Sequence, residues 1–305
     1  MKIGFRWLGF VLILSLLISV DSVYATMSST NYQINWDSIS AGGDDTSSSS
    51  SYILRDSIGL QGTGNSSSTS YSVNFGYRAG VFDQTADFTI YIQDRASQVS
   101  ATLATSTTVT VTSTSGFADG DYIALVQDEG SSQNTAIGKI SSISSPIITV
   151  DSWTYSAALP APNGTDDYVY SLDATTLSLG TLVPGNISTS IIAWEVTAEV
   201  DDGFSVYFYE DQDLTSGSNT IDDVSDGSVN GVQDEYGARS SDTTLALSTF
   251  DTVDTAITST AQQIASESAT SFDTRGFITL KATVDGTVAD GTYTQNLTLM
   301  YVGDY

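Results

Sequence analysis

Histidine and cysteine are absent from all 305 residues of the chain. Without histidine there is no Ser-His or Cys-His nucleophile and no histidine metal ligand, so the commonest hydrolases are excluded. Without cysteine there is no disulfide, so the fold depends on a hydrophobic core large enough to offset chain entropy. In an exported protein, this absence also indicates a prokaryotic exporter that does not rely on oxidation.

Basic residues are scarce: the chain has 9 lysine and arginine residues against 36 acidic ones, for a net charge of −27. Such a charge repels nucleic acids and anionic membranes, so neither is an expected partner. Only six of the acidic residues are glutamate, and the rest are aspartate. Aspartate favours turns whereas glutamate favours helices, so this ratio predicts a β protein with charged loops.

Residues 1–25 have the three parts of a secretory signal peptide. Lys2 and Arg6 precede an apolar run over residues 7–20, and Ala25 ends a short cleavage motif. The alternative is an uncleaved anchor, but the run is shorter than the roughly 20 residues of a spanning helix. We therefore expect cleavage after Ala25, no membrane insertion of the mature chain, and a secreted, extracellular or cell-surface location.

Residues 26–82 contain three copies of a serine-rich motif that ends in tyrosine: SSTNYQI, SSSSYIL and SSTSYSV. A spacing near 20 residues is typical of a structural repeat. Tyr32, Ile34 and Trp36 alternate as on one face of a strand. A flexible tether is the alternative, but it gains nothing from aromatic residues kept in phase. We predict β repeats whose tyrosine rings pack on the next domain or on another molecule.

The rest of the chain predicts two β modules. Residues 101–170 read as a small β-barrel of four or five strands, with a tight turn at Gly120 before a buried strand. Residues 83–100 and 171–305 read as one sandwich that this barrel interrupts. In that sandwich, residues 88–92 and 177–182 are predicted to be neighbouring pieces of one sheet.

Several turn segments of the sandwich carry a family resemblance; they are Leu179-Gly180-Thr181-Leu182, Pro184-Gly185, Asp202-Gly203-Phe204 and Gly291-Thr292-Tyr293. They resemble the immunoglobulin-like sandwiches of secreted bacterial surface proteins. The sandwich is also distantly similar to the WxL cell-wall-binding domain, which is named for two Trp-x-Leu motifs. Trp194-Glu195-Val196 and Trp153-Thr154-Tyr155 are its nearest matches, and both depart from the motif. The resemblance implies an all-β, immunoglobulin-like fold at a cell surface.

Aspartates crowd the segment between residues 201 and 235, and calcium binds six to eight oxygen ligands of this kind. The strict EF-hand template fails, because from Asp222 its third ligand would be Val224. Solvated turns are the alternative interpretation. The candidate calcium ligands are Asp211, Asp213, Asp222, Asp223 and Asp226. No other cofactor is expected.

Three predicted strands of the sandwich carry polar or tyrosine side chains between apolar ones. Glu195 and Glu199 fall on one face of a strand, and we interpret this face as solvated; the alternative is the carboxylate pair of a glycosidase. Lys281 alternates with apolar residues and is predicted to face outward. The bacterial surface sandwiches that the chain resembles sometimes crosslink a lysine to an asparagine beside a buried acid, and the outward position of Lys281 argues against that bond here. Tyr207 and Tyr209 are also predicted to face outward, where we expect a loop or the repeat strands to cover them; the alternative is contact with a sugar ring or a neighbouring subunit.

Together these features predict an exported, non-catalytic structural or interaction protein, such as a subunit of an envelope layer, a fibre or an adhesive coat. The expected partners are other copies of the chain or other envelope proteins, which would meet strand edges and aromatic faces. The alternative is a glycan- or cell-wall-binding module that uses Tyr207, Tyr209 or Trp153. An enzyme with a carboxylate pair is the third class.

Overall fold

The computed structural model describes residues 86–198 and 202–304, and the backbone of six short strands between residues 27 and 75. The chain divides into two units, Met1–Phe82 and Asp83–Tyr305. The predicted signal peptide, the rings of the three repeat tyrosines and Glu199 lie outside the described residues. No described helix is long and apolar enough to cross a membrane.

The first unit contains three antiparallel strand pairs, and their strands are β1 (Met27–Ser28), β2 (Gln33–Ile34), β3 (Ser47–Ser48), β4 (Ile53–Leu54), β5 (Gly64–Ser67) and β6 (Ser72–Phe75). The pairs are β1–β2, β3–β4 and β5–β6. The second strand of each pair starts directly after a repeat tyrosine in the sequence. The strand pairs therefore recur in phase with the sequence repeat.

The second unit begins with a strand of the sandwich, β7 (Ala86–Ile92), and the short 3-10 helix η1 (Arg95–Ser97), and then forms a closed barrel. The barrel order is β10-β11-β12-β9-β8-β13, closed by pairing of β13 with β10. Its strands are β8 (Val99–Ala104), β9 (Thr108–Val111), β10 (Tyr122–Gln127), β11 (Asn134–Ser144), β12 (Ile147–Tyr155) and β13 (Tyr168–Ser171). The barrel thus has six strands, and the expected four or five were too few.

Strand β10 shows how the barrel is fixed to the rest of the unit. Gly120, with a φ of 95°, makes the turn that precedes this strand, a conformation that glycine adopts without strain. Ile123 and Leu125 point into the barrel, where they belong to one buried cluster. Tyr122, Ala124 and Val126 point the other way and belong to a second cluster with Ile191, Ala193 and Phe277 of the sandwich. One strand therefore contributes to two cores.

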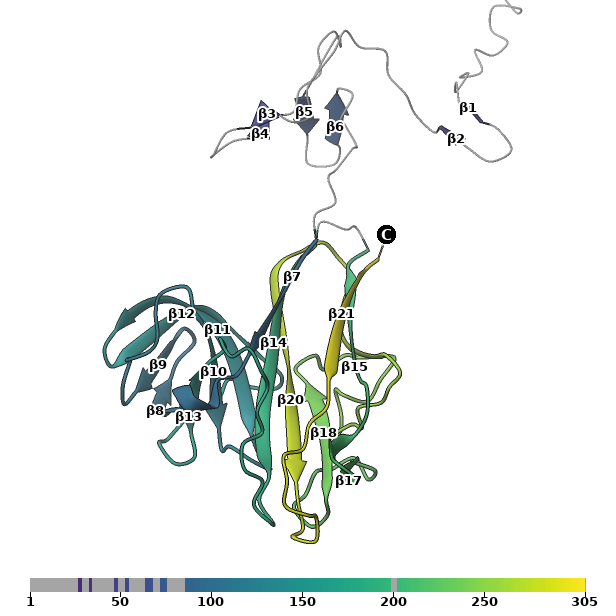
Figure 1. The fold of residues 1–305 in the computed structure, drawn as a ribbon. Coiled ribbons are helices and arrows are strands. Elements are labelled where there is room, and N and C mark those ends of the chain that lie inside the picture. The colour runs from purple at the N-terminus through teal and green to yellow at the C-terminus, as the bar shows by residue number, and fades with distance from the viewer. Residues whose placement is uncertain are drawn as a thin grey trace, which may run out of the picture. The chain divides into compact units, whose positions relative to one another are not determined.

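The sandwich consists of two sheets that face each other (Figure 1). The six-stranded sheet has the order β16-β17-β18-β20-β14-β7, and the three-stranded sheet has the order β19-β15-β21. Its further strands are β14 (Ser188–Ala198), β15 (Phe204–Glu210), β16 (Leu214–Ser216), β17 (Asn219–Asp223), β18 (Glu235–Ser240), β19 (Gln262–Glu267), β20 (Ser271–Thr283) and β21 (Leu297–Gly303).

The core between the two sheets combines side chains from both. Trp194 and Val196 of β14 and Ile278 of β20 meet Phe204 and Phe208 of β15, and each of the five is at most 2% exposed. Alternating inward side chains from facing sheets are the pattern expected of a sandwich. The fold is all-β, with sheets and a closed barrel.

One expected sheet contact is absent. Residues 177–182 form no strand, although Leu177, Leu179 and Leu182 pack against the core as partly buried residues. The strand that pairs with β7 is β14, with Ile90 opposite Trp194. The prediction that residues 177–182 form strand beside residues 88–92 is therefore wrong. The alternating leucines of this segment pack against the core, but its backbone is not part of a β-ladder.

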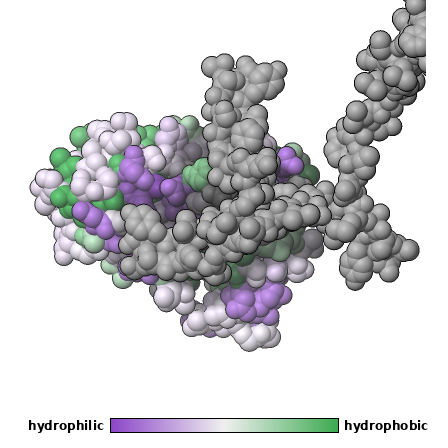
Figure 2. All heavy atoms as spheres, turned by 90° about the horizontal axis from the view of Figure 1, so that it is seen from above, coloured by the Kyte–Doolittle hydropathy of each residue, from purple (hydrophilic) through white to green (hydrophobic). Residues whose placement is uncertain are grey.

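The described surface carries isolated large apolar side chains as well as charged ones. On the barrel, Leu103 is 58% exposed, Tyr155 is 44% exposed and Ile147 is 40% exposed. Figure 2 shows hydrophobic and hydrophilic residues interspersed over the barrel side of the unit. Scattered exposure of this kind is ordinary for a protein surface and marks no site by itself.

Candidate functional site

The outer face of the three-stranded sheet gathers tyrosine, methionine and valine side chains. In the ladder between β15 and β21, Tyr207 lies opposite Met300 and Ser205 lies opposite Val302. Met300 is 39% exposed, Val302 is 37% exposed, and Tyr207 and Tyr209 are half-buried. We call Tyr207, Tyr209, Met300 and Val302 the interaction face.

The interaction face results from strict alternation along β15. Phe204, Val206 and Phe208 point inward and are at most 1% exposed. The tyrosines between them must then point to the opposite side of the strand. Sequence reasoning found Tyr207 and Tyr209, but it missed Met300 and Val302, because the neighbour of β15 in the sheet cannot be read from its own pattern.

The interaction face adjoins a free strand edge. Strand β21 is the last strand of its sheet and β7 is the last strand of the other, so each has one side without a strand partner among the described residues. The rings of Phe88 on β7 and Tyr301 on β21 stack at 5.9 Å between centroids. These two edges therefore lie on the same side of the sandwich (Figure 1). Ile90 of β7 is 41% exposed there.

Trp153, the third residue considered for ligand contact, belongs to the barrel core. It is 9% exposed, and its indole Nε1 donates a hydrogen bond of 3.2 Å to the carbonyl oxygen of Thr105. Its ring therefore has little face left for a ligand. The interaction face does not include it.

Three carboxylates converge where β15 ends. Oxygen atoms of Glu210, Asp213 and Asp223 all lie within 4.8 Å of one another. Glu210 is only 4% exposed and accepts a short hydrogen bond from the hydroxyl of Tyr236. We call Glu210, Asp213 and Asp223 the acidic cluster.

The carboxylates of the acidic cluster lie close together in a site that is partly shielded from solvent. Burial raises the pKa of Glu210 to about 7, against the hydrogen bond from Tyr236 and with the help of the charges on Asp223 and Asp213. Burial likewise raises the pKa of Asp223, although the backbone N–H of Ile257 favours its ionised form. Carboxylate oxygens at this spacing are the ligands that calcium prefers.

The structure brings together only two of the five predicted calcium ligands, Asp213 and Asp223. Asp211 instead accepts hydrogen bonds from the backbone and side-chain nitrogens of Asn296, at 2.8 and 2.6 Å. Asp222 accepts one from the hydroxyl of Thr220, and Asp226 accepts one from the backbone N–H of Ser228. Sequence reasoning missed Glu210, although the period of β15 places it on the same inward face as Phe208.

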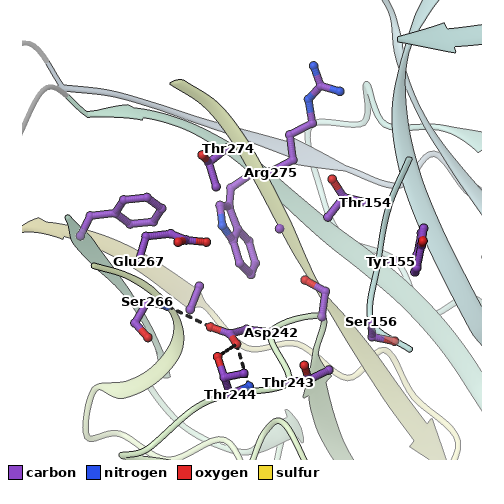
Figure 3. Close-up of a pocket in the computed structure, with 15 residues that line it drawn as sticks. Thr154, Tyr155, Ser156, Asp242, Thr243, Thr244, Ser266, Glu267, Thr274 and Arg275 are labelled. Atoms are coloured by element: carbon purple, nitrogen blue, oxygen red, sulfur yellow. Dashed lines mark hydrogen bonds between the residues drawn. The ribbon is translucent and has the colours of Figure 1, made fainter. Parts of the chain in front are cut away.

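A cavity of about 230 Å³ lies where the barrel meets the sandwich. Trp194 and Phe204 line it together with hydroxyl groups from both modules, and Figure 3 shows Glu267 and Asp242 beside the indole ring. Asp242 is already engaged, since it accepts hydrogen bonds from the backbone N–H groups of Ser266 and Thr244. The wall of this cavity therefore combines one apolar surface with acidic and hydroxyl groups.

Glu195 lies at the junction of the two modules rather than on a solvated face. It accepts hydrogen bonds from the hydroxyl of Tyr122, at 2.6 Å, and from Nε of Arg275, at 2.7 Å. Burial alone would raise the pKa of Glu195, but these bonds outweigh it and hold the pKa below its ordinary value. The interpretation of Glu195 as a surface residue is therefore wrong, because the barrel covers the outer face of β14.

The chain matches no family model, no curated protein and no solved structure.

Proposed function

We propose that this chain is an exported, non-catalytic structural or interaction protein of a prokaryotic cell surface, built on an immunoglobulin-like sandwich. The observation that supports this most is the interaction face beside the free edge of β21, with the free edge of β7 on the same side. The absence of histidine from the sequence and the resemblance of its turn segments to surface sandwiches agree with it.

The mechanism would be association through strand edges and aromatic surface. An edge strand presents unpaired N–H and C=O groups that a strand of another molecule can use. Tyrosine and methionine beside that edge add apolar area, and such residues are enriched in interfaces. The partner would be a second copy of the chain or another envelope protein. The high negative charge would keep copies apart at low ionic strength, so we expect assembly to increase with salt.

Light scattering and electron microscopy of the concentrated protein test this proposal. We expect ordered assemblies for the native chain and a loss of assembly for Met300→Lys with Val302→Lys, because two charges would then lie beside the edge. Leu103→Lys with Ile147→Lys is the matched control, since both are exposed apolar residues on the barrel and the change in charge is the same. A chain that stays monomeric at high concentration in salt, or variants that assemble like the native chain, would contradict the proposal.

The alternative is a glycan- or cell-wall-binding module, and the cavity between barrel and sandwich favours it. Carboxylate and hydroxyl groups on the cavity wall can hydrogen-bond sugar hydroxyls, whereas the indole of Trp194, which is 2% exposed, offers no open face for stacking. A pulldown on insoluble polysaccharides tests this alternative, with Glu267→Ala as the variant expected to reduce retention. Retention of the native chain that Glu267→Ala abolishes, in the absence of assembly, would favour glycan binding.

A further inference from the structure

The cavity between the barrel and the sandwich, which we call the junction cavity, has an acidic wall. Asp242 lies in the loop that follows β18, and Glu267 is the last residue of β19. Both residues line the cavity, and Figure 3 shows their carboxylate groups on the side that the sandwich forms. The volume of about 230 Å³ is far more than the roughly 15 Å³ that a single water molecule needs. The junction cavity therefore has room for a small organic group beside two carboxylates.

Arg275 also lines the junction cavity, but its charge is used elsewhere. Its Nε atom donates a hydrogen bond to Glu195, and both of its terminal nitrogens donate to Asp151. Figure 3 shows the guanidinium group pointing away from Asp242 and Glu267. The cavity lining contains no other lysine or arginine among the described residues, so its wall has an excess of negative charge. A cavity of this sign attracts cations, and the net charge of −27 adds to the attraction.

The two carboxylates of this wall differ in how they are held. Asp242 Oδ1 accepts hydrogen bonds from the backbone N–H and the hydroxyl of Thr244, both at 2.9 Å, and Oδ2 accepts one from the N–H of Ser266 at 3.1 Å. These bonds fix the direction of the carboxylate, and Oδ2 retains an acceptor site because a carboxylate oxygen has two lone pairs. Glu267 is exposed, and no hydrogen bond joins it to the residues drawn in Figure 3. The cavity therefore combines one fixed acceptor with one adaptable acceptor.

An exposed aromatic ring lies on the barrel side of the junction cavity. Tyr155 is the last residue of β12, lines the cavity and is 44% exposed. Trp194 and Phe204 also line it, but each is at most 2% exposed, so Tyr155 offers the accessible ring. Figure 3 shows Tyr155 on the side opposite to the two carboxylates. An aromatic face attracts a cation through its negative charge, so a cation in this space is favoured from both sides.

We propose that the junction cavity binds a small organic cation that carries a guanidinium group. Such a group is flat, has several N–H donors and no acceptor, and is less strongly hydrated than an ammonium group. It can donate hydrogen bonds to Asp242 and Glu267 while its plane lies against the ring of Tyr155. A neutral ligand can use the same acceptors but does not offset their charge. No residue of the interaction face lines the junction cavity, so this binding does not depend on the assembly proposed above.

Nuclear magnetic resonance of the dilute full-length exported chain, at constant ionic strength, tests the proposal. The probe is propylguanidinium, and the control is propylurea, which has the same planar shape but no charge. We expect saturable shifts at the backbone N–H groups of Thr244 and Ser266 and at the indole N–H of Trp194, with a dissociation constant about tenfold lower for propylguanidinium than for propylurea. Glucose is the third probe, because the glycan alternative predicts binding of a neutral sugar. Equal dissociation constants for the first two probes, shifts with glucose alone, or no saturable shift at these groups would overturn the proposal.

Variants separate a specific site from general attraction to an acidic protein. Glu267→Gln retains the side-chain volume and a hydrogen-bond acceptor but removes one charge of the cavity, so the dissociation constant of propylguanidinium should rise about tenfold. Tyr155→Leu removes the ring but retains apolar area, and it should raise that constant about threefold. Asp226→Asn is the matched control, because it removes one exposed carboxylate that does not line the cavity. Equal weakening by Glu267→Gln and Asp226→Asn would show that the probe follows net charge, and it would overturn the site.

Discussion

Arg275 binds Glu195 and Asp151 at once, with Nε 2.7 Å from Glu195 Oε2 and its two terminal nitrogens 2.8 and 2.6 Å from the oxygens of Asp151. Glu195 belongs to the sandwich and Asp151 to the barrel. A guanidinium group suits this position because its fixed fork can satisfy two carboxylates. Arg275 also lies over the ring of Tyr122 on β10, at 5.3 Å from the centroid. Arg275 therefore links the barrel to the sandwich through both carboxylates.

Arg275→Ala should destabilise this unit by about 3 kcal/mol, because it leaves the partly buried Glu195 without its cation. The side chain of Glu195 is 16% exposed, whereas that of Asp151 is 41% exposed, so most of the loss comes from Glu195. Urea unfolding measures the change. Arg239→Ala is the control, since exposed Arg239 binds only the backbone oxygen of Thr252 among the described residues and should cost less than about 1 kcal/mol. Equal losses for both variants would contradict the role of Arg275.

The acidic cluster predicts a stability that falls as the pH rises from 5 to 8. The pKa of Glu210 is about 7 in the folded chain and ordinary in the unfolded chain, so the folded state binds the extra proton between those values. Its contribution is complete at low pH and is lost as the pH rises through 7. We expect a loss on the order of 2 kcal/mol between pH 5 and 8, discounted for solvent at the exposed side of the cluster.

Glu210→Gln isolates this effect, because glutamine can still accept the hydrogen bond from Tyr236 but does not titrate. Relative to Glu210→Gln, the native chain should lose stability on the order of 2 kcal/mol between pH 5 and pH 8, as measured by urea unfolding. Exposed Glu267→Gln is the matched control and should leave the pH profile of the native chain unchanged. A native profile that Glu210→Gln does not alter would show that the environment of Glu210 is more solvated than its burial indicates.

Calcium is the second probe of the acidic cluster. A divalent cation bound by Glu210, Asp213 and Asp223 would stabilise their ionised forms, so millimolar calcium should raise the melting temperature at pH 8 more than at pH 5. Asp213→Asn should abolish most of this increase, whereas Asp226→Asn, outside the cluster, should retain it. Sodium chloride at equal ionic strength controls for screening of the net charge. An equal response of both variants would assign the calcium effect to general charge.

The strand pattern predicts what each strand contributes to one core, but not what lies on its other side. The alternation of residues along β15 predicts that Phe204 and Phe208 point inward and Tyr207 outward, as observed. The same alternation along β14 predicts that Ile192, Trp194 and Val196 point inward, as observed, but it also predicts that Glu195 lies in solvent. The barrel that covers Glu195 is distant in sequence, and no local periodicity can report it. The outward face predicted for Lys281 is likewise covered, since Lys281 is 8% exposed and forms an ion pair with Asp254 at 2.9 Å.

The acidic cluster shows the complementary limit for the candidate site. Composition identified a region rich in aspartate, but which carboxylates converge depends on the end of β15 and on the hairpin of β16 and β17. Asp213 directly precedes β16 and Asp223 is the last residue of β17, so closure of the hairpin brings them together. Asp211 is drawn away by Asn296 on the segment before β21. Glu210 was predictable from strand period alone, because it continues the inward series of Phe204, Val206 and Phe208.

Gly276 tests how tightly the central tryptophan is held. A Cβ atom at this position would lie 2.6 Å from Cζ2 and 2.9 Å from Nε1 of Trp194, which is 2% exposed. Gly276 does not require a positive φ, so alanine would be tolerated by the backbone and the cost would come from overpacking alone. We expect Gly276→Ala to destabilise the unit by about 2 kcal/mol and to change the fluorescence of the tryptophan. Gly276→Ala should destabilise the Trp194→Leu variant less than it destabilises the native chain, because leucine leaves room for the methyl group. Additive losses in that double-mutant cycle would show that Gly276 and Trp194 are not coupled through packing.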